Sequence, residues 1–136
     1  MKVSKLFVVS GKRKTAVAKV KVGAGSGKIT YNGLSYEHLP FFHKIALQEP
    51  LVIAKASIGD VHADFHITTS GGGREGQIQA ARLGLAKAIV AFLESPELKK
   101  TFLKYDRSLL VADTRRKETY KPGDSKARAK RQKSYR

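Results

Sequence analysis

The last 23 residues of the chain, 114–136, are almost without apolar side chains, and this constrains the fold more than any other feature. The only apolar residues there are Tyr120, Ala127, Ala129 and Tyr135. Such a segment cannot bury enough surface to offset the entropy lost when it is ordered. We therefore predict one globular domain over residues 1–113 and an extended tail over residues 114–136. Fully extended, the tail would span about 75 Å at about 3.3 Å per residue.

The charge of the chain is segregated in the same way. The chain has 27 Lys and Arg against 11 Asp and Glu, a net charge of +16. Residues 1–28 carry 8 basic and 0 acidic residues, residues 29–113 carry 9 of each, and residues 114–136 carry 10 basic and 2 acidic residues. A neutral body between two basic ends indicates a polyanionic partner, RNA or DNA. The alternatives are lysine enrichment for solubility and, for the tail alone, a localisation signal or solubilising arm.

Several classes of protein are excluded or disfavoured by what the sequence lacks. With no cysteine, disulfides and thiolate metal sites are excluded. No apolar run reaches about 18 residues, and the N-terminal segment is too short and too basic for a secretory signal. We expect a soluble, intracellular protein with no membrane partner, no cofactor and no metal.

The first third of the chain has the period of β-strands. In residues 15–22 one face of the predicted strand carries only apolar side chains, namely Ala16, Ala18, Val20 and Val22. Residues 6–9 form a preceding apolar run, closed by Ser10 and Gly11, and residues 28–31 lead into the hairpin pair Asn32-Gly33. We interpret this region as a β meander. Residues 61–68 alternate similarly, and a strand there would end at Gly71–Gly73.

Helical patterns fill most of the remaining body. Residues 42–49 predict a short helix that Pro50 must interrupt or restart. Residues 76–93 carry apolar side chains at helical spacing, and Ser95-Pro96-Glu97 is a start signal for another helix. The order strands, helix, strand, helix, helix predicts an α+β domain in which helices pack against one mixed sheet.

Three motifs are compatible with an enzyme or a ligand site. Gly71–Gly76 fits G-x-G-x-x-G, but no second strand with an acidic end follows. The alternatives are a helix N-terminus that approaches an RNA phosphate, with Arg74 adding charge, and a turn that needs positive φ.

Gly23–Lys28 departs from the phosphate-loop pattern at two positions. His62, Asp64 and His66 share a strand face, but residues four apart in a strand are about 13 Å apart, too far for one metal. A nucleotide-binding enzyme that uses the Gly71–Gly76 loop therefore stays the alternative function.

The basic segments carry the stronger indication. Lys12, Arg13 and Lys14 lie where one predicted strand connects to the next, and a loop there would direct three cations at phosphates. In the tail, small residues separate the cations, which suits a chain that threads an RNA groove, and Tyr135 can stack on a base or a ribose.

Four ordered blocks, together with these basic segments, resemble a known family. They are Gly11–Ala16, the glycine segment from Gly71 with Gln77, Ala81 and Arg82, the block Tyr105–Leu110, and the ending Gln132–Arg136. Together they closely resemble the universal small-subunit ribosomal protein family called S9 in bacterial and S16 in eukaryotic naming. The resemblance runs essentially end to end, and the Gln-Lys-Ser-Tyr-Arg ending is similar to the archaeal and eukaryotic branch.

The resemblance implies a fold, a location and a set of partners. It implies a fold like domain 2 of ribosomal protein S5, in the head of the cytoplasmic small ribosomal subunit, on the 3′ major domain of the rRNA and beside neighbouring head proteins. It implies a structural, non-enzymatic role without a small-molecule substrate. The tail tip would touch the anticodon stem-loop of the P-site tRNA through Lys133, Ser134, Tyr135 and Arg136. The expected rRNA-binding residues are Lys12, Arg13, Lys14, Arg74, Arg115, Arg116, Lys117, Lys121, Lys126, Arg128, Lys130 and Arg131.

Overall fold

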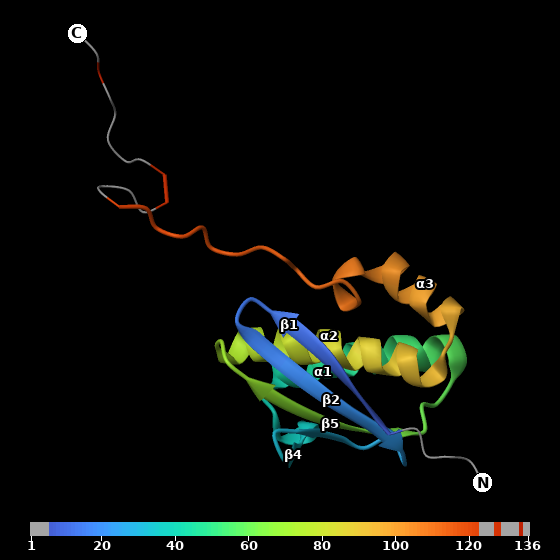
Figure 1. Cartoon of the computed structure of the whole chain (residues 1–136). Helices are drawn as coiled ribbons and strands as arrows, with labels where there is room; N and C mark the ends of the chain where they lie inside the picture. The colour runs from blue at the N-terminus through green and yellow to red at the C-terminus, as the bar shows by residue number, and fades with distance from the viewer. Residues whose placement is uncertain (1–5, 123–126, 129–133, 135–136) are drawn as a thin grey trace.

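A five-stranded sheet with helices against one face forms the body of the protein. The computed structural model describes residues 6–122, 127–128 and 134. The strands are β1 (Phe7–Arg13), β2 (Ala16–Ala24), β3 (Ile29–Tyr31), β4 (Leu34–Ser35) and β5 (Ala63–Ser70). The helices are α1 (Phe41–Ile58), α2 (Arg74–Leu93) and α3 (Pro96–Tyr105), with short 3-10 turns η1 (Tyr36–His38) and η2 (Arg107–Leu109). Figure 1 shows α1 and α2 on one side of the sheet, with α3 at their side. The predicted α+β class and the predicted order of elements are confirmed.

The order of strands in the sheet is β1-β2-β5-β3-β4. β5 pairs antiparallel with β2 and parallel with β3, so the sheet is mixed, as predicted. The predicted meander of the first third is wrong, because β5 lies between β2 and β3. Which strand enters between two others is decided by tertiary packing, and the alternation of residues 61–68 carries no information about its neighbours.

The core lies between the sheet and the helices. Ala18, Val20 and Val22 on β2 and Phe65 on β5 are fully buried, which confirms the inward face that the alternation predicts. Asn32 and Gly33 have φ values of 49° and 85°, so the expected tight hairpin joins β3 to β4. α2 supplies the largest set of buried helical residues and contacts β1, β2, β5 and α1.

Pro50 does not interrupt the first helix, contrary to the prediction. α1 runs through it as one element of 18 residues. A proline inside a helix removes one backbone hydrogen bond and costs roughly 3 kcal/mol or more. Here Leu47, Pro50 and Ala54, at helical spacing, are all buried where α1 packs on α2. Burial of that face offsets the local cost, and local propensity could not reveal it.

The C-terminal helix starts as its sequence predicts. The Ser95 hydroxyl accepts a hydrogen bond from the backbone N–H of Leu98 at 3.4 Å, and Pro96 occupies the first helical position. Leu98 and Phe102 are fully buried on its inner side. The short turn η2 follows, after which the described residues 112–122 contain no helix or strand and lead away from the body (Figure 1). No helix among the described residues is long and apolar enough to cross a membrane.

Candidate nucleic-acid interface

The β1–β2 hairpin differs from the predicted loop. β1 continues through Ser10 and Gly11 to Arg13, which pairs with Ala16 on β2. Only Lys14 and Thr15 form the turn, with φ at 52° for Lys14. Gly11 does not end the strand, because α2 crosses β1 there. A Cβ atom on Gly11 would lie 2.1 Å from the carbonyl oxygen of Ala80 and 2.5 Å from the amide nitrogen of Gly84.

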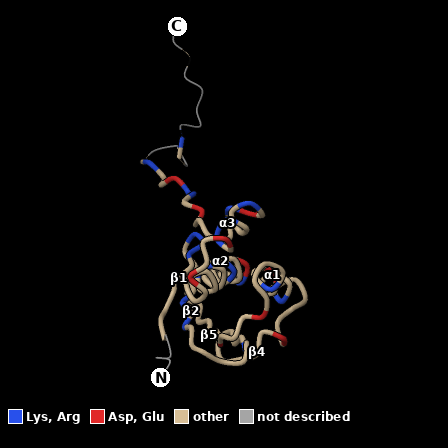
Figure 2. Tube along the Cα trace, turned by 90° about the vertical axis from the view of Figure 1, so that its right-hand side faces the viewer, with Lys and Arg blue, Asp and Glu red and all other residues tan. Residues whose placement is uncertain are grey.

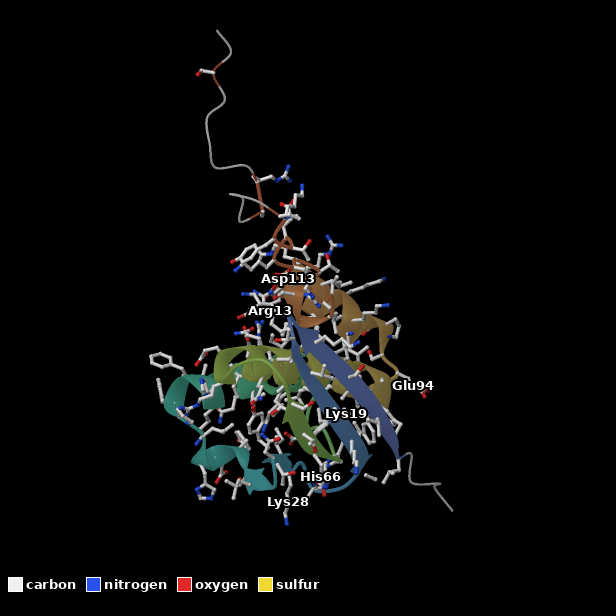
Figure 3. The ribbon with its side chains drawn as sticks, turned by 60° about the vertical axis from the view of Figure 1, so that its left-hand side comes forward. Arg13, Lys19, Lys28, His66, Glu94 and Asp113 are labelled. Atoms are coloured by element: carbon white, nitrogen blue, oxygen red, sulfur yellow. The ribbon has the colours of Figure 1, made fainter. Side chains whose placement is uncertain are left out.

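Asp113 joins this hairpin to the start of the tail. Its carboxylate accepts a hydrogen bond from Nη1 of Arg13, a residue 100 positions earlier in the chain. The same carboxylate accepts hydrogen bonds from Nη2 of Arg115 at 2.7 Å and from the backbone N–H of Arg115 at 3.0 Å. Figure 3 shows Arg13 and Asp113 side by side at one end of the body, where the tail leaves. This contact sets the direction in which the tail starts.

The two arginines also change the ionisation of Asp113. Hydrogen bonds from the side chain and backbone of Arg115, and then from Arg13, hold the pKa of the Asp113 carboxyl far below its ordinary value of 3.8. The carboxylate is therefore charged at physiological pH. It holds two guanidinium groups close together, although like charges repel each other.

Six of the expected rRNA-binding residues thereby come together on one surface. We call it the hairpin–tail surface and define it by Lys12, Arg13, Lys14, Arg115, Arg116 and Lys117. A hollow of about 590 Å³ is lined by five of them together with Thr15. Figure 2, in which Lys and Arg positions are blue along the backbone trace, shows such positions near β1 and along the first part of the tail. Within the described part of the chain, Lys12 and Lys14 have no ion pair with a carboxylate, so both can neutralise phosphates directly.

Arg74 lies elsewhere. It begins α2 and lines a separate hollow with His38, His43 and Gln77. The preceding glycines are explained by backbone geometry. Gly71 and Gly72 have φ values of 71° and 63°, and a Cβ on Gly71 would lie 2.7 Å from the carbonyl oxygen of Thr15. The glycine segment is thus a turn packed tightly against the β1–β2 hairpin, one of the two alternatives that the sequence left open.

The remaining tail cations are described only in part. Glu118 pairs with Nε of Arg128 at 3.1 Å and with Nζ of Lys121 at 3.9 Å. Ser134 is described and belongs to no helix or strand. The other expected contact residues lie outside the described residues; they are Lys126, Lys130, Arg131, Lys133, Tyr135 and Arg136.

His62, Asp64 and His66 are not brought together around one centre. Oδ1 of Asp64 accepts hydrogen bonds from the backbone N–H groups of Gly27 and Lys28 at 3.1 and 2.9 Å, so this carboxylate holds the loop between β2 and β3. Nδ1 of His66 lies 2.7 Å from Oγ1 of Thr30 on the neighbouring strand. Figure 3 places Lys28 and His66 at the end of the sheet opposite Arg13.

Sequence reasoning missed a polar cluster that supports the interface. Nε of Arg82 on α2 donates to Glu49 on α1 at 2.5 Å, and its Nη2 donates to Asp106 at 3.2 Å. Asp106 in turn accepts hydrogen bonds from the backbone N–H and the hydroxyl of Ser108, at 2.8 and 2.7 Å. The cluster therefore ties η2, from which the tail departs, to two helices. Arg82 and the Tyr105–Leu110 block were already the residues that carry the family resemblance, but spacing alone gave them no role.

Comparisons with known proteins agree with this geometry. A family model described as ribosomal protein S9/S16 matches residues 11–136. The chain belongs to the ribosomal protein S9/S16 family. Small ribosomal subunit protein uS9 of Methanococcus maripaludis strain C5 is 47% identical over 129 residues, which cover 93% of this chain and 95% of the relative. The protein of the same name from Methanococcus vannielii is 46% identical over the same shares.

Membership in the S9/S16 family confirms several predictions. The family is structural and not enzymatic, so the prediction that the chain is not an enzyme is confirmed and the nucleotide-binding alternative is not supported. The Methanococcus relatives are archaeal, in agreement with the branch that the C-terminal residues indicated. The small ribosomal subunit, to which these relatives are assigned by name, is cytoplasmic, as predicted.

Proposed function

We propose that the chain is a structural constituent of the small ribosomal subunit that binds the rRNA of the head, the 3′ major domain, through the hairpin–tail surface. Membership in the S9/S16 family supports the ribosomal role. The observation that carries the rRNA-binding role is the contact of Arg13 and Arg115 with Asp113, which brings two distant basic segments into one surface. Neighbouring head proteins are the other expected partners.

The mechanism of binding is electrostatic. Each lysine or arginine that meets a phosphate releases condensed counterions, so affinity falls as salt rises. Phosphate contacts of this kind fix position and orientation on the RNA and do not read its sequence. Because Asp113 binds both Arg13 of the hairpin and Arg115 of the tail, the two basic segments face the RNA from one surface of the body. The division into a body, residues 1–113, and a tail, residues 114–136, and the likeness of the body to S5 domain 2 form part of this proposal.

The salt dependence of rRNA binding tests this role. The double variant Lys12→Gln/Lys14→Gln removes two phosphate contacts, so the slope of log K against log salt falls by about 2. The matched control is Lys99→Gln/Lys100→Gln on α3, where both lysines are exposed and away from the hairpin. Equal slopes for the hairpin variant, the control and the unchanged chain, measured with a transcript of the 3′ major domain, would show that the hairpin does not bind this RNA.

The tip of the tail is proposed to contact the anticodon stem-loop of the P-site tRNA through Lys133, Ser134, Tyr135 and Arg136. The net positive charge of the tail and the stacking capacity of Tyr135 support this part. Ribosomes whose copy of this protein lacks residues 134–136 should lose P-site tRNA faster, and the difference should shrink at high salt. Equal retention across salt concentrations would refute the assignment of the tip, while leaving the rRNA-binding role unaffected.

A further inference from the structure

A second hollow, of about 550 Å³, lies between the end of β1, the middle of α2, η2 and the start of the tail. It shares Lys12, Arg13 and Arg115 with the hairpin–tail surface. It also extends along α2 to Gln79 and Leu83, which have no role in the proposed function. Pockets that hold small organic molecules occupy about 300–1,000 Å³. The hollow is therefore large enough for a nucleotide-sized group.

One part of this hollow is apolar. Gln79 and Leu83 are four residues apart on α2, so their side chains share one face of the helix. Leu83 is only 4% exposed, yet it does not belong to the buried cluster between the sheet and the helices. Val111, which follows η2, lines the same hollow and is 43% exposed. Leu83 and Val111 thus form the apolar part of the lining of this hollow.

The rim of the hollow is positively charged. Lys12, Arg13, Arg107 and Arg115 line it together with two carboxylates, Asp106 and Asp113. Both carboxylates are already occupied, Asp113 by two arginines and Asp106 by Arg82 and Ser108. Arg107 is exposed and, among the described residues, has no ion pair. The excess positive charge selects an anionic ligand, and Arg107 can bind a phosphate in a bidentate manner.

We infer that this hollow binds one unpaired nucleotide of an RNA, with its base on Leu83 and Val111, its polar edge at Gln79 and its phosphate at Arg107. Proteins read unpaired RNA bases by stacking or apolar contact with the ring and by hydrogen bonds to its edge. The Gln79 amide both donates and accepts, as such an edge requires. An acidic peptide would use the cations alone. The inference rests on the proposed function and adds a nucleotide-specific contact to it.

The first test is a titration of the full chain with a short single-stranded oligouridylate, followed by NMR at the Gln79 side-chain amide and the Val111 methyl groups. Three further probes are an oligomer of equal length without bases, uridine monophosphate and an oligoglutamate. We expect the oligouridylate to shift both groups and to bind about five- to ten-fold more tightly than the oligomer without bases, because only it has an apolar ring to bury. If the base-free oligomer or the oligoglutamate bound as tightly at these residues, or if uridine monophosphate, which carries one base and one phosphate, shifted neither group, the inference would be overturned.

The second test uses variants of exposed residues. Val111→Asp places a carboxylate in the hollow and should weaken oligouridylate binding about ten-fold through repulsion of the phosphate and loss of apolar contact. Val52→Asp, at a valine of α1 that is 64% exposed, is the matched control and should bind as the unchanged chain does. Gln79→Ala, also at an exposed position, should reduce the preference over the base-free oligomer, and it serves as the test if Val111→Asp does not fold.

The failure of this inference can be distinguished from the failure of the proposed function. If Val111→Asp and Gln79→Ala bind oligouridylate as the unchanged chain does, while Lys12→Gln/Lys14→Gln still lowers the salt slope for rRNA, the hollow does not bind a nucleotide and the rRNA-binding role stands. If no variant changes the binding of either RNA, both proposals are wrong.

Discussion

Replacement of Arg82 by methionine should destabilise the body through the polar cluster that joins α1, α2 and η2. Met keeps an unbranched apolar stem but has no charge and no hydrogen-bond donor, so the variant leaves the carboxylates of Glu49 and Asp106 without their shared partner. Burial lowers the pKa of Arg82, but the hydrogen bonds with Glu49 and then Asp106 outweigh it and raise the pKa above its ordinary value. The guanidinium is therefore always charged, and its loss removes a charged hydrogen-bond donor at every pH that the fold tolerates.

The size of the effect follows from burial and the number of bonds. The Arg82 side chain is 14% exposed, whereas Glu49 and Asp106 are 26% and 37% exposed. A hydrogen bond to a charged group contributes about 1.5–3 kcal/mol, and solvent screening of the two carboxylates reduces the sum, so we expect a loss of about 2–3 kcal/mol in unfolding free energy. With about 2.1 cal/mol/K of unfolding entropy per residue over the body, the midpoint Tm should fall by about 8–13 °C.

Thermal and urea unfolding measure this loss. Arg107→Met is the matched control, because Arg107 is an arginine of η2 next to the cluster, is exposed and has no ion pair among the described residues. Its unfolding free energy should change by less than about 0.5 kcal/mol. A double-mutant cycle with Glu49→Gln should give a coupling of about 1 kcal/mol or more with Arg82→Met, since the two side chains are in direct contact.

Two results would refute this reasoning. If Arg82→Met and Arg107→Met had equal Tm values, the cluster would contribute no more than an exposed arginine does. If the double-mutant cycle gave no coupling between Arg82 and Glu49, the bond at 2.5 Å would not contribute to stability.

Three further predictions concern stability and the body. Hydrogen bonds from Ser108, and then from Arg82, lower the pKa of Asp106 below 3.8, so Asp106→Asn should cost about 1 kcal/mol of unfolding free energy at neutral pH. Urea unfolding should show this difference from the unchanged chain disappear as the pH falls below 3.8. A difference that stayed constant with pH would argue against a charged Asp106. Gly11→Ala should destabilise the body by about 2–3 kcal/mol, because the added Cβ would meet the backbone of α2. Gly33→Ala should cost only about 1–2 kcal/mol, because Gly33 has φ at 85° but open space around it. The opposite order of stabilities in thermal unfolding would contradict this packing. A chain that ends at Asp113 should still unfold cooperatively in calorimetry, and loss of a cooperative transition would contradict the division into body and tail.

The sequence predicts the elements well where local signals are strong. Two such signals are the apolar alternation at Ala18, Val20 and Val22 and the helix start at Ser95-Pro96. Both depend only on residues that are close together in the sequence. These local signals fail where packing between distant segments of the chain determines the structure. α1 continues through Pro50 because its buried face packs on α2, and β5 enters beside β2 through pairing over about 45 residues of chain, which no local period encodes.

The candidate site shows the same division. Its cations are visible in the sequence, because charge segregation needs no structure to be recognised. Asp113 is not visible as a functional residue, since it is one of nine acidic residues in a neutral body. Only the fold places it against Arg13 and so turns two basic segments into one surface. Lys12 and Arg13 were expected in a loop but lie in β1, because Gly11, which seemed to end the strand, allows α2 to cross it.

Co-sedimentation of the full chain with the small ribosomal subunit, in sucrose gradients at rising salt, tests the central claim most directly. The account predicts that the protein stays with the small subunit at salt concentrations that release nonspecifically bound polycations from RNA, because the hairpin and the tail bind as one surface of a folded body. A protein that remained at the top of the gradient, or that left the subunit at the salt concentration that releases a simple polylysine, would contradict it.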